Sequence, residues 1–166
     1  MTENASTRTA PQTVEPIRRG ITVDVAQERA FDVFTGDMTS WWPATHHIGS
    51  APIAEIIIEP KSGGRWYTRH EDGSETSTGY VVAYDRPHRL VVTWQIGHDW
   101  TYRPDLVTTI EIRFEAEGPD RTRVELEHRD LASFGEHAEE MRAIFGADDA
   151  WNQILADFAA AAEGGA

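Results

Sequence analysis

The hydrophobic positions near the end of the chain follow the period of a helix. Four large apolar side chains are spaced i, i+3, i+4 and i+7, namely Trp151, Ile154, Leu155 and Phe158. This spacing places all four on one side of a helix. Residues 148–162 are therefore predicted to form one long C-terminal helix, and a helix with one apolar face needs a partner surface.

Most of the chain before this helix alternates apolar and polar residues in short runs, which is the period of a β-strand. The predicted strands cover residues 17–25, 53–59, 65–70, 76–84, 89–97, 107–117 and 121–129. Short turns join most of them, so the sheet is predicted to be mostly antiparallel. Gly79 interrupts one strand and is predicted to mark a bulge or a close approach of two backbones.

Two short helices are predicted between the first two strands. The first begins near Ala26, and its apolar face consists of Ala30, Phe31, Val33 and Phe34. The second is predicted to be capped by Asp37 and ended by Pro43.

These elements predict an α+β domain in which a curved sheet wraps around the C-terminal helix. An antiparallel sheet must cover its apolar face, and the last helix is the longest predicted helix available to do so. A strongly twisted sheet that curls around a helix leaves a hollow beside it. We expect one domain over residues 15–163, a flexible polar tail over residues 1–14 and a short C-terminal tail over residues 164–166.

Composition excludes several function classes. The formal net charge of −13 opposes binding to nucleic acid or to an anionic membrane surface. The chain has no cysteine, which removes disulfides and thiolate chemistry. It shows no apolar run typical of a signal peptide or a membrane span, so we expect a cytoplasmic protein.

Several short segments, in a fixed order along residues 17–162, resemble a known family. They are Phe31-Asp-Val-Phe34, Trp41-Trp42, Gly63-Gly64-Arg65-Trp66, Asp85-Arg86-Pro87-His88-Arg89-Leu90 and Leu126-Glu127-His128. The chain is similar to homologues of the activator of the 90-kDa heat-shock protein ATPase, within the START-like (SRPBCC, helix-grip) superfamily. This resemblance implies a helix-grip fold with an internal cavity. The fold alone does not identify the ligand.

The resemblance implies three functions. The first is binding of a small hydrophobic or aromatic molecule between the sheet and the last helix. The second is a co-chaperone role toward the heat-shock ATPase, although this sequence has a short polar tail where the co-chaperones carry an additional domain. The third is a cyclase- or hydrolase-type enzyme that uses the same cavity, with His128 or a loop histidine as acid or base. A homodimer is also compatible with the sequence.

The candidate cavity residues are six tryptophans and one histidine: Trp41, Trp42, Trp66, Trp94, Trp100, His128 and Trp151. Flat aromatic walls suit a mostly apolar ligand, but the same side chains could simply fill a core. Trp100 lies in a predicted loop and is expected at the rim. His128 points inward by alternation, either as a buried histidine bonded to a neighbour or as a polar anchor for a ligand.

No catalytic signature, cofactor motif or metal-ligand pattern is present in the sequence. His46 and His47 form the only histidine cluster. Adjacent residues on an extended segment point to opposite sides, so the pair is not expected to bind a metal.

Overall fold

Seven strands form one sheet in the order β1-β7-β6-β5-β4-β3-β2, in a computed structural model that describes residues 14–164. The strands are β1 Ile17–Val23, β2 Ile53–Ile58, β3 Arg65–His70, β4 Glu75–Asp85, β5 Arg89–Trp94, β6 Thr108–Gly118 and β7 Arg121–Arg129. Every neighbouring pair is antiparallel, which confirms the prediction. The two predicted tails lie almost entirely outside the described residues.

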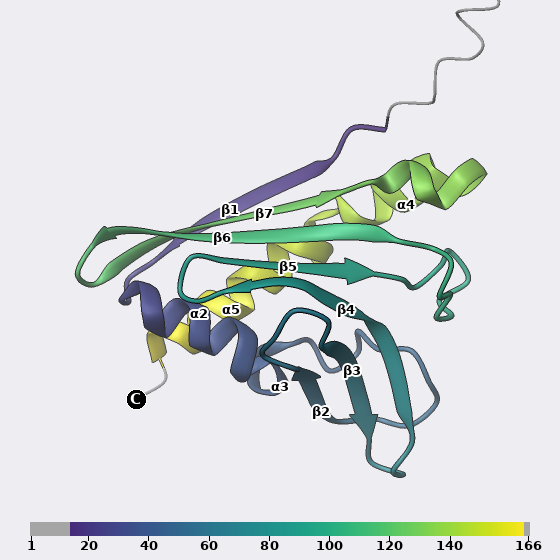
Figure 1. Cartoon of the computed structure of the whole chain (residues 1–166), viewed down its shortest axis with the longest axis horizontal. Coiled ribbons are helices and arrows are strands. Elements are labelled where there is room, and N and C mark those ends of the chain that lie inside the picture. Colours follow the sequence, from purple (N-terminus) through teal and green to yellow (C-terminus); the bar gives the residue numbers. More distant parts are fainter. Residues whose placement is uncertain (1–13, 165–166) are drawn as a thin grey trace, which may run out of the picture.

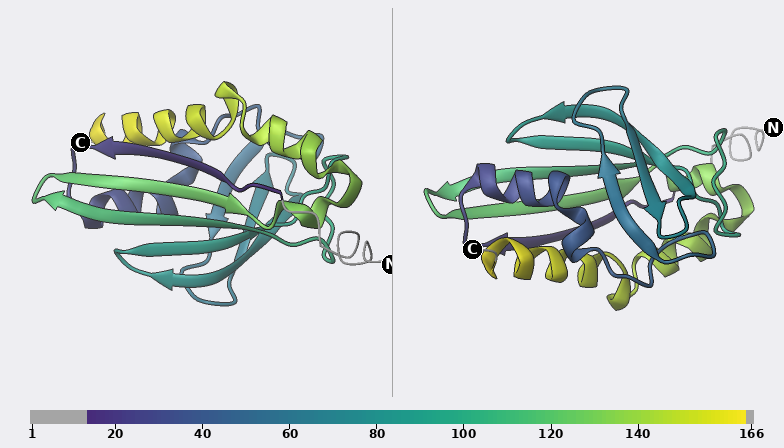
Figure 2. Two further views of the ribbon diagram at one scale, coloured as in Figure 1. Left: turned by 90° about the horizontal axis from the view of Figure 1, so that it is seen from above. Right: turned by 90° about the horizontal axis from the view of Figure 1, so that it is seen from below.

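The helices lie against the concave face of this sheet. They are α2 Gln27–Gly36, α3 Met38–Trp41, α4 Ala138–Phe145 and α5 Gln153–Gly164, with a 3-10 helix at Leu131–His137 before α4. Figures 1 and 2 show the sheet curving around α5 with α2 beside it, and α5 contacts both α2 and β1. The first and second strands lie at opposite edges, so α2 and α3 carry the chain across the concave face. The predicted helix-grip arrangement is confirmed.

Gly79 sits at the bend of the sheet. The β3–β4 register shifts there: Trp66 pairs with Gly79, whereas Tyr67 pairs with Ser77. A Cβ at Gly79 would lie 2.0 Å from the carbonyl oxygen of Thr93 on β5. The position is therefore both a bulge and a close backbone approach, and β3 and β2 turn away from the other strands beyond it (Figure 1).

The C-terminal helix begins later than predicted. Ala150 has non-helical backbone angles (φ −100°, ψ −117°), so residues 148–152 form a distorted turn before α5. The predicted apolar stripe nevertheless faces the core, with Trp151, Ile154, Leu155 and Phe158 at most 4% exposed. Each such side chain contributes about 1.5–3 kcal/mol through burial. Asp37 does lie at the N-cap of α3, but its side chain makes no capping hydrogen bond.

Four phenylalanines fill one half of the space between helices and sheet. Phe34 of α2 packs edge-on against Phe114 of β6 and Phe158 of α5, with ring centroids 5.8 and 5.2 Å apart. Phe31 meets Phe114 at 5.2 Å. This half of the interior is a packed core, which leaves the other half for a cavity.

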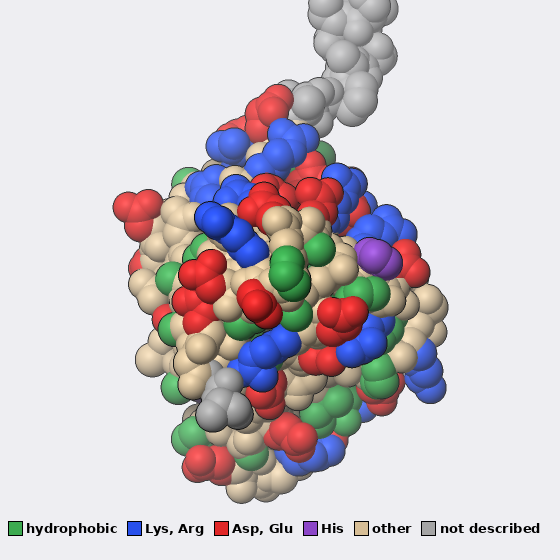
Figure 3. Space-filling model, turned by 90° about the vertical axis from the view of Figure 1, so that its left-hand side faces the viewer, with side chains coloured by type: hydrophobic (Ala, Val, Ile, Leu, Met, Phe, Trp, Pro, Cys, Tyr) green, Lys and Arg blue, Asp and Glu red, His purple; other side chains and the backbone are tan. Residues whose placement is uncertain are grey.

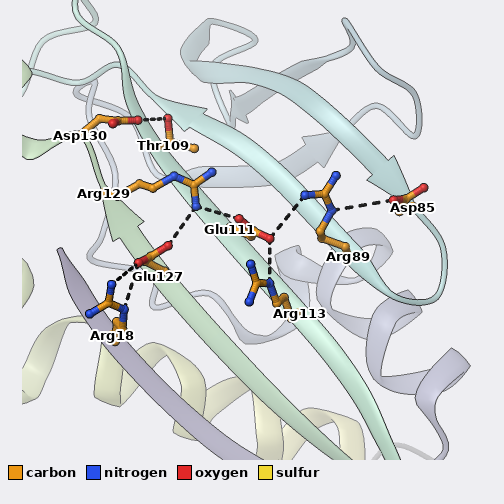
Figure 4. A network of polar contacts seen from close by, with 9 residues as sticks. All are labelled: Arg18, Asp85, Arg89, Thr109, Glu111, Arg113, Glu127, Arg129 and Asp130. Atoms are coloured by element: carbon orange, nitrogen blue, oxygen red, sulfur yellow. Dashed lines mark hydrogen bonds and ion pairs between the residues drawn. The ribbon is translucent and has the colours of Figure 1, made fainter.

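The outer face of the sheet carries an ion-pair network centred on Glu111 (Figure 4). The Glu111 side chain is 5% exposed and accepts hydrogen bonds from Arg113 at 2.8 Å and Arg129 at 2.7 Å. Burial alone raises the pKa of Glu111, but the hydrogen bonds from Arg129 and Arg113 outweigh it, so the net pKa is lowered. At one end of the molecule, acidic and basic side chains are likewise intermixed, with small apolar areas between them (Figure 3).

Candidate functional site

A cavity of about 320 Å³ lies between the bent part of the sheet, the loop after α3 and the start of α5. Its lining comes from segments far apart in the chain: residues 42–48, strands β2 to β5, Trp100, the end of α4 and residues 149–154. Small-molecule sites typically have volumes of about 300–1,000 Å³. The cavity is therefore large enough for a small planar ligand.

Five of the seven predicted residues line this cavity, namely Trp42, Trp66, Trp94, Trp100 and Trp151. Four of them form a closed ring of indoles. The ring centroids are 6.2 Å apart for Trp42–Trp66, 5.9 Å for Trp66–Trp94, 6.4 Å for Trp94–Trp151 and 6.3 Å for Trp42–Trp151. Trp100 is 45% exposed and lies at the rim, as its position in a predicted loop suggested.

Trp41 does not border the cavity. It is 5% exposed, its ring packs against Phe34 and Phe158, and its indole N–H donates to the carbonyl oxygen of Val33 at 2.9 Å. Trp41 belongs to the packed half of the interior, so the structure separates it from its neighbour Trp42.

His128 also lies outside the lining, directly behind the aromatic wall. Trp151 Nε1–H donates to His128 Nδ1 at 3.2 Å, and His128 Nε2 lies 2.9 Å from Thr108 Oγ1. The Thr108 hydroxyl donates to the carbonyl oxygen of Trp94 at 2.8 Å. Because that hydroxyl hydrogen is already committed, Nε2 must carry the imidazole hydrogen and donate to Thr108. The Trp151 indole, His128, Thr108 and the Trp94 carbonyl thus form a chain of hydrogen bonds, each donating to the next. This chain links two walls of the cavity.

Complete burial makes this histidine a structural group. It is 0% exposed, and burial lowers its pKa to about 3. His128 is therefore neutral at neutral pH, with both nitrogens engaged. Of the two roles considered from the sequence, this geometry supports the buried histidine bonded to its neighbours.

Three threonines that were not among the predicted site residues form a polar strip. Thr68 on β3 and Thr76 and Thr78 on β4 all line the cavity. Thr68 and Thr78 are only 7% and 8% exposed, and their hydroxyls make no hydrogen bond with the described residues. Alternation along the two predicted strands could have placed them on the same face as Trp66, but threonine is so common in strands that it carries no chemical signal by itself.

The mouth of the cavity holds further polar groups. His46, His47 and Asp149 all contribute to the lining. The prediction that the two histidine side chains point to opposite sides assumed an extended segment. The segment is an irregular loop there, and the alternation of a strand does not apply. Within residues 14–164, no group of three or more acidic or histidine side chains is arranged to hold a metal ion.

One donor in the wall has no hydrogen-bond partner among residues 14–164. The indole N–H of Trp94 is buried and makes no hydrogen bond with any described residue. An unpaired buried donor costs about 1–3 kcal/mol, so an acceptor supplied by water or ligand would stabilise it.

The family model for Activator of Hsp90 ATPase homolog 1-like protein matches residues 24–163. The chain belongs to this family. No helix of the described residues is long and apolar enough to cross a membrane. None of the curated proteins matches the chain.

Solved structures of similar proteins agree with this assignment. The anthrahydroquino-γ-pyrone synthase Txn09, complexed with SUM, is 35% identical over 90% of this chain and 97% of its own, with a TM-score of 0.63. The self-sacrificing resistance protein CalC from Micromonospora echinospora is 28% identical over 87% of this chain and 91% of its own, with a TM-score of 0.66. The Aha1 dimer from Colwellia psychrerythraea is 15% identical over 90% of this chain and 97% of its own, with a TM-score of 0.59, and it shares the fold.

Proposed function

We propose that this protein binds a planar aromatic small molecule in the tryptophan-lined cavity. The observation that carries the proposal is the group of four mutually packed indoles in the lining of a cavity of about 320 Å³, with Trp100 at the rim. Aromatic contacts contribute about 0.5–1.5 kcal/mol each beyond the burial of area. Several flat walls therefore favour a flat ligand over a flexible aliphatic one.

The relatives support this choice of ligand. The 35% identical protein is named as a synthase of an anthrahydroquino-γ-pyrone, which is a fused aromatic compound. A cavity walled by indoles and edged by threonine hydroxyls suits a molecule of that class: apolar over its faces and oxygenated at its edge.

The first experiment is native mass spectrometry of the purified protein, followed by denaturation. An extra mass of a few hundred daltons that is lost on denaturation is expected for a ligand that fits this cavity. The released molecule is then identified and used for titrations monitored by tryptophan fluorescence.

Variants locate the binding site. Trp66→Ala and Trp94→Ala are expected to abolish binding, but both side chains are less than 9% exposed, so their folding must be checked by circular dichroism. Trp100→Ala is the sharper test because its side chain is 45% exposed. Tyr80→Ala is its matched control, since Tyr80 is 43% exposed and does not line the cavity. Equal affinity in the folded Trp100 and Tyr80 variants would contradict the proposed site.

The second candidate function is acid–base catalysis on a bound aromatic substrate, as in a cyclase. His46, His47 and Asp149 lie in the cavity lining, where they could exchange protons with a ligand, whereas His128 is enclosed. His47→Gln is expected to abolish turnover but retain ligand binding if this function is correct. Unchanged turnover in both a His46→Gln and a His47→Gln variant would exclude these histidines as the acid or base.

The family takes its name from activation of the Hsp90 ATPase. A pull-down with that chaperone, together with its ATPase rate in the presence of this protein, tests a co-chaperone role. We rank it below ligand binding because the cavity provides a defined site for a small molecule.

A further inference from the structure

His70 determines whether the hydroxyl of Thr76, a residue of the cavity lining, donates or accepts a hydrogen bond. His70 Nδ1 lies 2.8 Å from the carbonyl oxygen of Ala51, and Nε2 lies 2.9 Å from Thr76 Oγ1. A carbonyl oxygen only accepts, so Nδ1 carries the hydrogen of the neutral imidazole. Nε2 then has only a lone pair, and the Thr76 hydroxyl must donate to it.

This arrangement leaves the oxygen of Thr76 as a pure acceptor. Its single hydrogen is committed to His70, so only lone pairs remain for a ligand in the cavity that Thr76 lines. Thr68 lies opposite Thr76 in the sheet register, and Thr78 is two residues along the same strand. Their hydroxyls have no partner among residues 14–164 and can rotate to donate or to accept.

The imidazole that sets this polarity is held firmly. His70 is 1% exposed, and Gly49 packs against its ring so closely that a Cβ on that glycine would lie 3.2 Å from Nε2. Gly49 has a positive φ of 92°, a conformation that favours glycine. The orientation of His70, and with it that of the Thr76 hydroxyl, is set by the protein before any ligand binds.

We propose that the cavity recognises a hydroxyl group on its aromatic ligand through Thr76, and so selects hydroxylated aromatic molecules over their O-methylated counterparts. This inference rests on the proposed function, since it specifies a polar substituent at the edge of the same planar ligand. A ligand hydroxyl donates to Thr76, whereas a methoxy or carbonyl oxygen placed there meets a second acceptor. The adjacent Thr68 and Thr78 hydroxyls accommodate either a hydroxyl or a carbonyl on the ligand, so a phenol bearing a neighbouring oxygen fits the strip best.

The test measures binding of 2-naphthol and of 2-methoxynaphthalene, in which a methyl group replaces the hydroxyl hydrogen, by equilibrium dialysis at pH 8. The wild-type protein is expected to bind the naphthol more tightly. Thr76→Val is expected to weaken naphthol binding about tenfold, the usual scale for one buried hydrogen bond, and to leave the methoxy compound within about twofold. Thr76→Ser, which restores the hydroxyl, is expected to recover the preference.

Thr78→Val is the matched control, because it removes a hydroxyl from the same strand and the same cavity wall but not the oriented one. It is expected to keep the wild-type ratio of the two affinities. If the ratio is unchanged in Thr76→Val, or falls equally in both valine variants, the inference is wrong while aromatic binding stands. If the wild-type protein binds the naphthol and the methoxy compound equally well, the inference is also wrong, whatever the variants show. Binding of neither probe would remove the proposed function, and the inference with it.

Discussion

The buried His128 makes the stability of the fold sensitive to mild acid. In the folded protein its pKa is about 3 because of burial, whereas in the unfolded chain it has the ordinary value of about 6.5. Above pH 6.5 both states carry a neutral imidazole, and the histidine makes no pH-dependent contribution. Below that pH the unfolded chain takes up a proton that the folded protein does not, so acidification favours unfolding.

The size of the effect follows from the two pKa values. Between pH 7.5 and pH 5, linkage predicts that this one group lowers the free energy of unfolding by about 2 kcal/mol. Carboxylates such as Glu111, whose pKa is lowered, lose their stabilising ionised form at lower pH than this window. Between pH 7.5 and pH 5, the effect of His128 on stability is therefore separated from that of Glu111.

The measurement is urea unfolding followed by tryptophan fluorescence at both pH values, for the wild type and for His128→Gln. The variant is expected to be less stable at pH 7.5 but to lose about 2 kcal/mol less on acidification than the wild type. The other six histidines are shared by both proteins and cancel in the comparison. The same pH dependence in both proteins, or an imidazole of His128 that titrates near pH 6.5 by NMR, would refute the reasoning.

Three further changes test other parts of the structure. Gly79→Ala should destabilise the fold by about 3 kcal/mol in urea unfolding, because its Cβ meets the Thr93 carbonyl oxygen; a change under about 1 kcal/mol would contradict the close approach. Glu111→Gln should cost about 2 kcal/mol at pH 7 and progressively less as the pH falls through the lowered pKa of the wild-type carboxylate, which is then itself protonated; a pH-independent loss would exclude the charge as the cause. Trp100→Ala should change stability by less than about 0.5 kcal/mol, as is usual at exposed positions, yet weaken ligand binding; a large shift in the unfolding midpoint would show that Trp100 is structural.

The sequence predicts the architecture well because the strands and helices bury regular patterns. Alternation predicts all seven strands, and the i, i+3, i+4, i+7 stripe predicts which face of α5 is buried. The kink at Ala150 is not visible in that pattern, and neither is the hydrogen bond from Trp151 to His128, which joins residues 23 positions apart.

The candidate site is predicted less completely, for reasons specific to each residue. Trp41 and Trp42 are adjacent at a helix end, so one can face the packed core while the other faces the cavity, and composition does not say which. His128 is correctly predicted to point inward, but its role depends on its partners Thr108 and Trp151. Thr76 gains its significance only through His70, whose own orientation depends on the backbone of Ala51 on a separate loop.

The hydrogen-bonded chain behind the aromatic wall also bears on the entropy of ligand binding. It joins Trp151, at the start of α5, through His128 and Thr108 to the backbone of Trp94 on β5. Two indoles on separate elements are thus held in place before a ligand arrives, so little side-chain freedom is lost on association. Because His128 touches both of these walls without touching the cavity, its imidazole resonances in an NMR spectrum provide an internal reporter of whether the site is occupied.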